Sequence, residues 1–342
     1  MKRLIALFAA LGLSLTLLSA CSPTSNKPLE AQNGAPSKIS VVCTNFAAYD
    51  FTRQVIGECG DRFDVNYLTG SGVDLHSYQP SVEDVASINK ADLFVYVGGE
   101  SDEWARDTAA DIDGLHSVSL LDAIGSAAVE EELVEGMSTG HDESEGDDSD
   151  HDHATSDDDH DDTPEYDEHV WLSLKNAQII VDAIADELGR VDPDSATTYA
   201  EHAAAYKQQL AELDKSYSDN ISQATYDTLV FADRFPFRYL TEDYQLSYYA
   251  AFPGCSAETE ASFDVVSFLA KKLDELGVDS VLVIEDSDQN LARTVINTSQ
   301  AHNQQILVID SLQSASHADI EAGKTYLSTM ENNLSVLMDA LT

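Results

Sequence analysis

The chain has 342 residues, of which 62 are Asp or Glu and only 18 are Lys or Arg, so its formal net charge is −44. A surface this negative repels phosphate backbones and argues against nucleic-acid binding, whereas cations are its natural small partners. Hydrophobic residues make up 43% of the chain, which excludes wholesale disorder. At roughly 100–200 residues per domain, we expect two domains.

The first twenty residues have the features of a lipoprotein signal peptide. Lys2 and Arg3 precede an apolar run over residues 4–18 that is too short to span a bilayer comfortably. The run ends in Leu-Ser-Ala-Cys, which is similar to a bacterial lipobox, where the cysteine is lipidated and becomes the new N-terminus. We therefore expect removal of residues 1–20 and a lipid on Cys21 that holds the chain at the extracytoplasmic face of the cell membrane. A plain signal peptide with a coincidental cysteine is the alternative.

The next segment of the chain begins with a tether and continues as an α/β lobe. Residues 21–38 are rich in Ser, Pro, Asn and Gly, which is typical of a flexible linker. Beyond them, apolar runs alternate with helix-like segments, and this alternation predicts βαβ units and a parallel sheet. Ser81 is a candidate helix cap, with Asp84 three residues further on. We expect strands over 39–44, 63–68, 93–97 and 117–121, helices over 46–56 and 81–89, and a lobe over 39–192.

A His/Asp-rich insertion, residues 141–168, interrupts this lobe. It contains no Lys or Arg and cannot bury a core, so we expect it to be disordered. Imidazoles and carboxylates both bind divalent metals, but a flexible chain loses entropy when it is ordered by an ion. We therefore expect weak accessory metal sites here, with a purely solvating linker as the alternative. The histidines of the insertion are His141, His151, His153 and His160.

The rest of the chain predicts a long helix and a second α/β lobe. Asp192 followed by Pro193 is a helix-start signal, and the next residues up to about 221 contain no Gly or Pro. We expect one linking helix over 193–222, and two shorter helices with a turn near 213–218 are the alternative. The second lobe spans 223–342, with strands over 228–231, 246–252, 280–284 and 305–309 and helices near 235–243, 261–276, 289–301 and 323–341.

Two histidines outside the insertion lie at the ends of predicted elements. His76 follows a strand, at the end of the sheet where open α/β sheets bind ligands, and His169 precedes a helix. A single histidine in such a place is more often structural. Two of them in an exported, cation-seeking chain favour a metal site.

The residues around these histidines resemble the ZnuA/TroA-like family, the solute-binding lipoproteins of zinc and manganese ABC transporters. GVDLHSYQP, residues 72–80, is similar to the family motif GxDPHxYEP, and DEHVWLSLKN, residues 167–176, is similar to DPHxWLSPxN. An acidic His-rich insertion before the second motif is typical of the zinc-selective branch. The resemblance covers essentially the whole mature chain. It implies two α/β lobes with mainly parallel sheets joined by one long rigid helix, and it implies His76 and His169 as metal ligands.

The second lobe departs from the family pattern. Residues 229–240 contain no histidine where relatives carry one, so Asp233 is the candidate ligand there, unless Arg234 pairs with it. The resemblance also implies a ligand after the final strand, where Asp310 lies, and Glu285 is a candidate to support or replace a ligand. A salt bridge for Asp233 and a helix cap for Asp310 are the alternatives. Two imidazoles with one or two carboxylates would hold zinc, and the carboxylates would also suit Mn²⁺.

The remaining cysteines do not indicate a metal site by their spacing. No CxxC motif is present, so a thiolate zinc finger is not supported. Cys43, Cys59 and Cys255 could form one disulfide in an oxidising compartment, and the sequence leaves their pairing open.

The family resemblance implies a monomeric extracytoplasmic receptor that delivers Zn²⁺, or Mn²⁺, to an ABC permease, with the ion held between the two lobes. A zinc-dependent hydrolase and a metal-binding surface adhesin are the alternatives. Because the chain lacks HExxH and shows no general base at the required spacing beside His76 or His169, we do not expect an enzyme.

Overall fold

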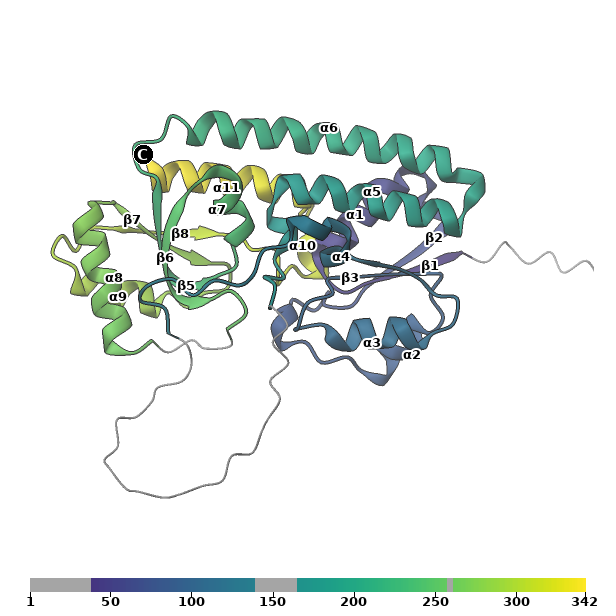
Figure 1. Ribbon diagram of the computed structural model, residues 1–342, viewed down its shortest axis with the longest axis horizontal. Helices are drawn as coiled ribbons and strands as arrows, with labels where there is room; N and C mark the ends of the chain where they lie inside the picture. The colour runs from purple at the N-terminus through teal and green to yellow at the C-terminus, as the bar shows by residue number, and fades with distance from the viewer. Residues whose placement is uncertain (1–37, 139–164, 257–260) are drawn as a thin grey trace, which may run out of the picture. The chain divides into compact units, whose positions relative to one another are not determined.

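The computed structural model of the protein describes residues 38–138, 165–256 and 261–342 (Figure 1). The signal peptide with Cys21, the tether up to residue 37 and the four histidines of the His/Asp-rich insertion lie outside these residues. Within the described part, no helix combines the length and the apolar character needed to cross a membrane.

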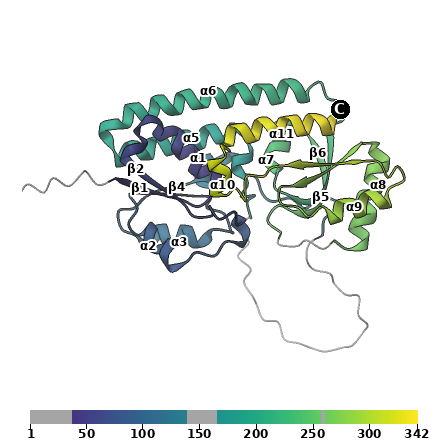
Figure 2. The same ribbon diagram turned by 180° about the vertical axis from the view of Figure 1, so that it is seen from behind.

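Four parallel strands in the order β2-β1-β3-β4 form the sheet of the N-terminal lobe. The buried positions of β1 and β3 are almost all apolar, as expected for a sheet covered on both faces. Helices α1 and α5 cover one face, while α2 and α3 lie on the other (Figures 1 and 2). The bounds are β1 Ile39–Cys43, α1 Phe46–Ile56, β2 Phe63–Tyr67, α2 Val82–Ile88, β3 Leu93–Tyr96, α3 Glu103–Asp111, β4 His116–Ser119, α4 Leu120–Ile124 and α5 Leu174–Val191.

The C-terminal lobe repeats this plan with a second parallel sheet, in the order β6-β5-β7-β8. Its helices α8 and α9 pack on one face of the sheet and α11 packs on the other. The bounds are β5 Thr228–Phe235, α7 Arg238–Tyr244, β6 Ser247–Pro253, α8 Phe263–Leu276, β7 Ser280–Ile284, α9 Asn290–Thr298, β8 Gln305–Ile309, α10 His317–Glu321 and α11 Tyr326–Leu341. Two parallel sheets flanked by helices confirm the predicted fold class.

A single helix, α6 (Ala196–Ile221), links the two lobes and is 26 residues long. Its buried side chains recur every three or four residues, which gives one continuous apolar stripe along the helix. The stripe packs on α1, α5 and α11 and consists of Tyr199, Ala203, Tyr206, Leu210, Leu213 and Tyr217. Because Leu213 and Tyr217 continue the stripe, the alternative of a turn near 213–218 is wrong.

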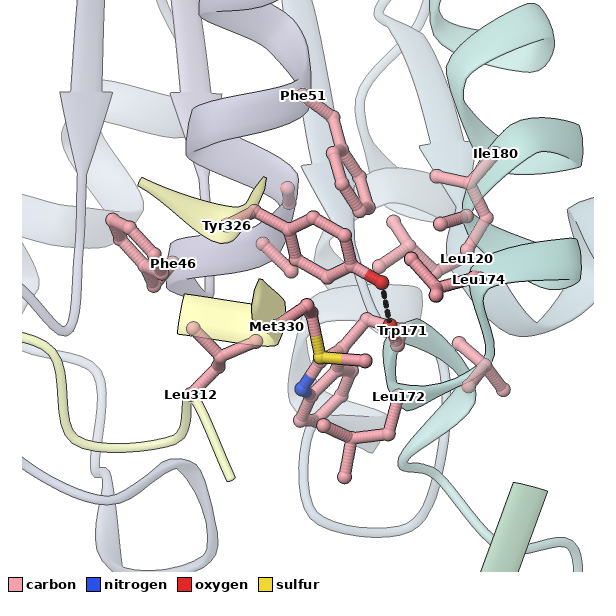
Figure 3. Close-up of a cluster of buried hydrophobic side chains, with 14 of the residues drawn as sticks. Phe46, Phe51, Leu120, Trp171, Leu172, Leu174, Ile180, Leu312, Tyr326 and Met330 are labelled. Atoms are coloured by element: carbon pink, nitrogen blue, oxygen red, sulfur yellow. Dashed lines mark hydrogen bonds between the residues drawn. The ribbon is translucent and has the colours of Figure 1, made fainter. Parts of the chain in front are cut away.

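One hydrophobic core runs through both lobes. Tyr326, at the start of α11, is fully buried among residues of the N-terminal lobe, and its hydroxyl donates a hydrogen bond of 2.7 Å to the backbone oxygen of Trp171 (Figure 3). Its ring meets the edge of Phe51 with centroids 4.6 Å apart. The C-terminal helix is therefore part of the packing around the N-terminal sheet.

The observed elements correct three details of the expected ones. The fourth strand begins at His116, and Leu120 and Leu121 belong to α4 rather than to the strand. Helices α3 and α10 were not expected. The disorder expected over residues 141–168 ends too late, since the last of these residues are ordered. Tyr166 forms a β-bridge with Glu130, and Asp167 and Glu168 are only 2% and 1% exposed. Hydrogen bonds hold these last acids in the fold, because Asp167 accepts from His169 and Glu168 accepts from the backbone N–H of Ser101, although their composition resembles that of the insertion.

Candidate metal centre

His76 lies in a short 3₁₀ turn, η2 (Leu75–Ser77), in the loop that follows β2. The carboxylate of Asp74 caps this turn by accepting the backbone N–H of His76 at 3.0 Å. The other oxygen of Asp74 forms an ion pair of 2.6 Å with Arg234 of β5. One carboxylate therefore fixes the His76 loop and also ties it to the C-terminal lobe.

His169 is fully buried just before a second 3₁₀ turn, η4 (Val170–Leu172). The Asp167 carboxylate accepts hydrogen bonds from the backbone N–H of His169 at 2.8 Å and from its ring Nδ1 at 3.0 Å. A carboxylate on one imidazole nitrogen orients the ring and makes the opposite nitrogen a better metal donor. Asp167 therefore leaves Nε2 as the nitrogen of His169 that faces His76.

The two predicted histidines meet. Nε2 of His76 and Nε2 of His169 are 3.0 Å apart, although 93 residues separate them in sequence. Two nitrogens at 2.0–2.1 Å from one zinc ion, at a tetrahedral angle, would lie about 3.3 Å apart. The Sγ atom of Cys255 joins them, and the three donor atoms all lie within 4.8 Å of one another.

The loop after β3 contacts the His76 ring through Ser101, on the side of Nδ1. The hydroxyl of Ser101 is 2.5 Å from Nδ1 of His76, and the backbone N–H of Ser101 donates to Glu168 at 2.7 Å. Glu168 reaches this loop across Gly99, where an added Cβ would lie 2.3 Å from the Glu168 side chain. The residue next to His169 in sequence thus helps to orient His76.

The environment of the two rings sets their protonation. Burial and the neighbouring His169 ring lower the pKa of His76 to about 3, so His76 is neutral near pH 7 and its lone pair is available. Burial of the His169 ring lowers its pKa, but the carboxylates of Asp167 and Glu168 more than offset this and leave the pKa raised. An ion bound here would face one neutral ring and one ring backed by negative charge.

An acidic cavity opens onto the His76 member of this pair. It has a volume of about 430 Å³, and its lining includes His76 and Cys255. Hydrogen bonding to the Glu100 carboxyl group, together with burial, raises the pKa of Glu165 to about 7. The glutamates that line the cavity are Glu100, Glu131, Glu165 and Glu168, and their negative potential would attract a cation.

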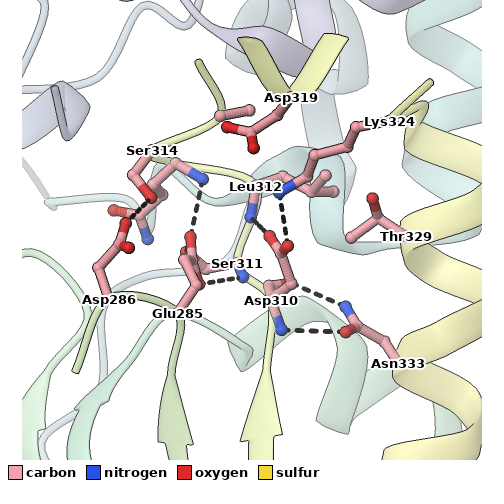
Figure 4. Close-up of polar contacts among 12 residues, drawn as sticks. Glu285, Asp286, Asp310, Ser311, Leu312, Ser314, Asp319, Lys324, Thr329 and Asn333 are labelled. Carbon is pink, nitrogen blue, oxygen red and sulfur yellow. Dashed lines mark hydrogen bonds and ion pairs between the residues drawn. The ribbon is translucent and has the colours of Figure 1, made fainter. Parts of the chain in front are cut away.

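The predicted oxygen ligands of the second lobe lie elsewhere. Asp310 forms an ion pair of 2.6 Å with Lys324 and accepts the backbone N–H of Leu312, so its carboxylate is committed (Figure 4). Asp233 accepts the backbone N–H of Arg234, whose guanidinium pairs with Asp74 instead. Neither Asp310 nor Asp233 belongs to the group of donor atoms formed by the two histidines and Cys255.

Glu285 supports the loop that follows β8 and does not belong to that group of donor atoms either. It accepts hydrogen bonds of 2.6 Å from both the backbone N–H and the hydroxyl of Ser311, and a longer one from the backbone N–H of Gln313 (Figure 4). Gln313 itself lies close enough to the imidazole of His76 to affect the pKa of that ring. Glu285 therefore positions Gln313, which sequence reasoning did not single out.

Gly254 allows the backbone after β6 to approach the His169 ring. A Cβ at residue 254 would lie 2.8 Å from Cε1 of His169 and 2.9 Å from the backbone oxygen of Phe235. We expect Gly254→Ala to displace the ring and to weaken zinc binding about tenfold, or about 1.4 kcal/mol. Gly60→Ala is the matched control, because nothing lies within 4 Å of a Cβ there. Equal affinities of the two variants in a competitive zinc titration would contradict this prediction.

Two four-stranded parallel sheets, a connecting helix and paired imidazoles from separate loops define a two-lobed solute-binding protein. The chain belongs to the ZnuA family, described as zinc-uptake complex component A periplasmic, whose model matches residues 41–340. The resemblance indicated by the motifs at 72–80 and 167–176 is thereby confirmed.

Individual relatives agree with this assignment. The chain is 33% identical over 337 residues to the zinc-binding lipoprotein AdcA of Streptococcus pneumoniae (strain ATCC BAA-255 / R6). The aligned region covers 98% of this chain and 60% of AdcA. It is 28% identical over 325 residues to the high-affinity zinc uptake system protein ZnuA of Bacillus subtilis (strain 168), covering 95% and 94% of the two chains. The crystal structure of the Zn(II)-bound ZnuA-like domain of S. pneumoniae AdcA superposes with a TM-score of 0.68 at 29% identity, over 89% of this chain and 99% of that one. The chain thus spans about three-fifths of the length of AdcA.

Proposed function

We propose that the protein is an extracytoplasmic receptor that captures Zn²⁺ between its two lobes and delivers it to an ABC permease. The observation that carries this proposal is the pair of imidazole nitrogens of His76 and His169, which lie 3.0 Å apart, with His76 lining an acidic cavity. Two of the relatives are named as a zinc-binding lipoprotein and a zinc uptake protein, and one related structure holds Zn(II). His76 and His169 are the proposed ligands.

A lipid on Cys21 would hold the receptor at the membrane surface, and the monomer would be its working form. Because the matched family is described as a zinc-uptake component, we favour the receptor over the hydrolase and the adhesin. Screening of the zinc-loaded protein for hydrolysis distinguishes the receptor from the hydrolase. Turnover that is lost in His169→Ala would argue for a hydrolase.

Zinc transfer is the direct test of the proposal. Cells that lack this protein should grow poorly when zinc is chelated, and the wild-type chain should restore zinc accumulation while His76→Ala should not. The reason is that the variant lacks one ring of the proposed ion site and should not capture the ion for transfer. Restoration by both proteins would contradict the receptor function.

Deletion of residues 141–162 should separate tight from weak binding. We expect calorimetry to show one tight zinc site in the deleted chain and the loss of several weak ones, since the four histidines removed are His141, His151, His153 and His160. The full chain measured in the same buffer is the control. Loss of the tight site would show that the insertion is not an accessory.

A further inference from the structure

We propose that Cys255 binds the captured ion through its thiolate, so that the protein holds zinc with two imidazoles and one sulfur. This inference rests on the proposed metal-binding function and adds a ligand that neither the sequence motifs nor the comparisons indicate. It replaces the carboxylates that the sequence suggested for the second lobe.

The donor geometry fits a single zinc ion. Sγ of Cys255 and the nitrogens of His76 and His169 lie within 4.8 Å of one another. With Zn–N distances of 2.0–2.1 Å and a Zn–S distance of about 2.3 Å, tetrahedral geometry places a sulfur about 3.6 Å from each nitrogen. The three donors are therefore close enough together to share one ion.

Cys255 is available for this role. It is a free thiol, as are Cys43 and Cys59 among the described residues. Cys43 is buried in β1 against the hydroxyl of Thr52, whereas Cys255 lines the acidic cavity beside His76. Gly254 sets the backbone of this loop against the His169 ring, which brings Cys255 to the ion site from the C-terminal lobe.

Gln313 is a second buried polar group beside the His76 ring. It is 2% exposed, and its side chain lies within hydrogen-bonding reach of the His76 ring. Since Gln313 is next to His76, rotation of its amide toward an ion held by the histidines and Cys255 would add an oxygen donor.

A thiolate would also decide the choice between zinc and manganese. Sulfur donors favour softer ions such as zinc, whereas Mn²⁺ favours carboxylate, carbonyl and water oxygens. Asp310 and Asp233, the oxygen donors that would suit Mn²⁺, are engaged with Lys324 and the backbone of Arg234. The receptor should therefore bind zinc much more tightly than manganese.

X-ray absorption of the zinc-loaded full chain tests the ligand directly. We expect one sulfur scatterer at about 2.3 Å in the wild-type protein and none in Cys255→Ser. With Co²⁺ as the probe, we expect a sulfur-to-cobalt charge-transfer band in the near ultraviolet that disappears in the same variant. Zinc affinity should fall at least about tenfold.

Cys59→Ser is the matched control and should keep both the sulfur scatterer and the cobalt band. The absence of sulfur around zinc in the wild-type protein would overturn the inference and leave the receptor function intact, because the histidines could still bind the ion. Unchanged zinc affinity in Cys255→Ser would overturn it equally. Failure of the proposed function looks different, since His76→Ala and His169→Ala would then also bind zinc as tightly as the wild type.

Discussion

Replacing His169 with alanine should lower the affinity for zinc by at least about a hundredfold, or about 2.8 kcal/mol. The ring of His169 is fully buried, and Asp167 holds its Nδ1 so that Nε2 points at His76. Because the donor is fixed before the ion arrives, its loss removes a metal bond as well as the organisation of the site. Equilibrium competition against a chelator of known zinc affinity measures the change.

The control for this substitution is His116→Ala. His116 lies at the start of β4, and its partly exposed ring pairs with Glu187 at 2.5 Å. It does not belong to the donor group of His76, His169 and Cys255. Glu187 keeps its ion pair with Arg190 in this variant, and the donor group of the ion site is untouched, so zinc binding should be unchanged. A loss of less than tenfold in His169→Ala, with the fold intact by circular dichroism, would remove His169 from the ion site.

The two histidines could be predicted because their signals are local. Each lies in a short motif at the end of an element, and parallel strands bring the loops at their carboxyl ends together. The contacts that decide the remaining donors are not local. Asp310 looks like a free carboxylate until Lys324, fourteen residues further on, is placed against it. Asp233 likewise precedes an arginine whose partner, Asp74, lies 160 residues away.

Cys255 and Gln313 were missed for a related reason. A single cysteine has no ligand spacing to recognise, and glutamine is not among the residues usually searched for metal binding. One signal was present in the sequence, because Cys255 follows the predicted strand over 246–252, as His76 follows an earlier strand. A search for donors after every strand of both sheets would have included it.

Most of the fold could be predicted because buried parallel strands are continuous apolar runs. The strands at 280–284 and 305–309 and the helix at 46–56 have the expected bounds. The start of β4 was misjudged because His116 and Ser117 are polar while Leu120 and Leu121 are apolar, although the latter begin a helix capped by Ser119. Tertiary packing overrides local hydrophobicity at that point.

Replacing Tyr326 with alanine should destabilise the protein by about 4 kcal/mol, the typical cost of removing a large buried ring. The ring is fully buried, contacts Phe51 edge to face and donates its hydroxyl proton to the backbone oxygen of Trp171 (Figure 3). Tyr326 belongs to the C-terminal helix, while Phe51 and Trp171 belong to the N-terminal lobe. Its loss should therefore weaken the packing between the two parts of the chain, which denaturant unfolding measures.

Tyr326→Phe separates the ring from its hydroxyl. This variant keeps the contact with Phe51 but leaves the Trp171 oxygen without its donor, so we expect a loss of about 1–3 kcal/mol. Because one core runs through both lobes, each variant should shift a single cooperative transition rather than unfold one lobe first. Two separate transitions in Tyr326→Ala, or equal stability of the two variants, would contradict the view that α11 joins the lobes. Since Trp171 follows His169 by two residues, the same core also sets how firmly the ion site is held.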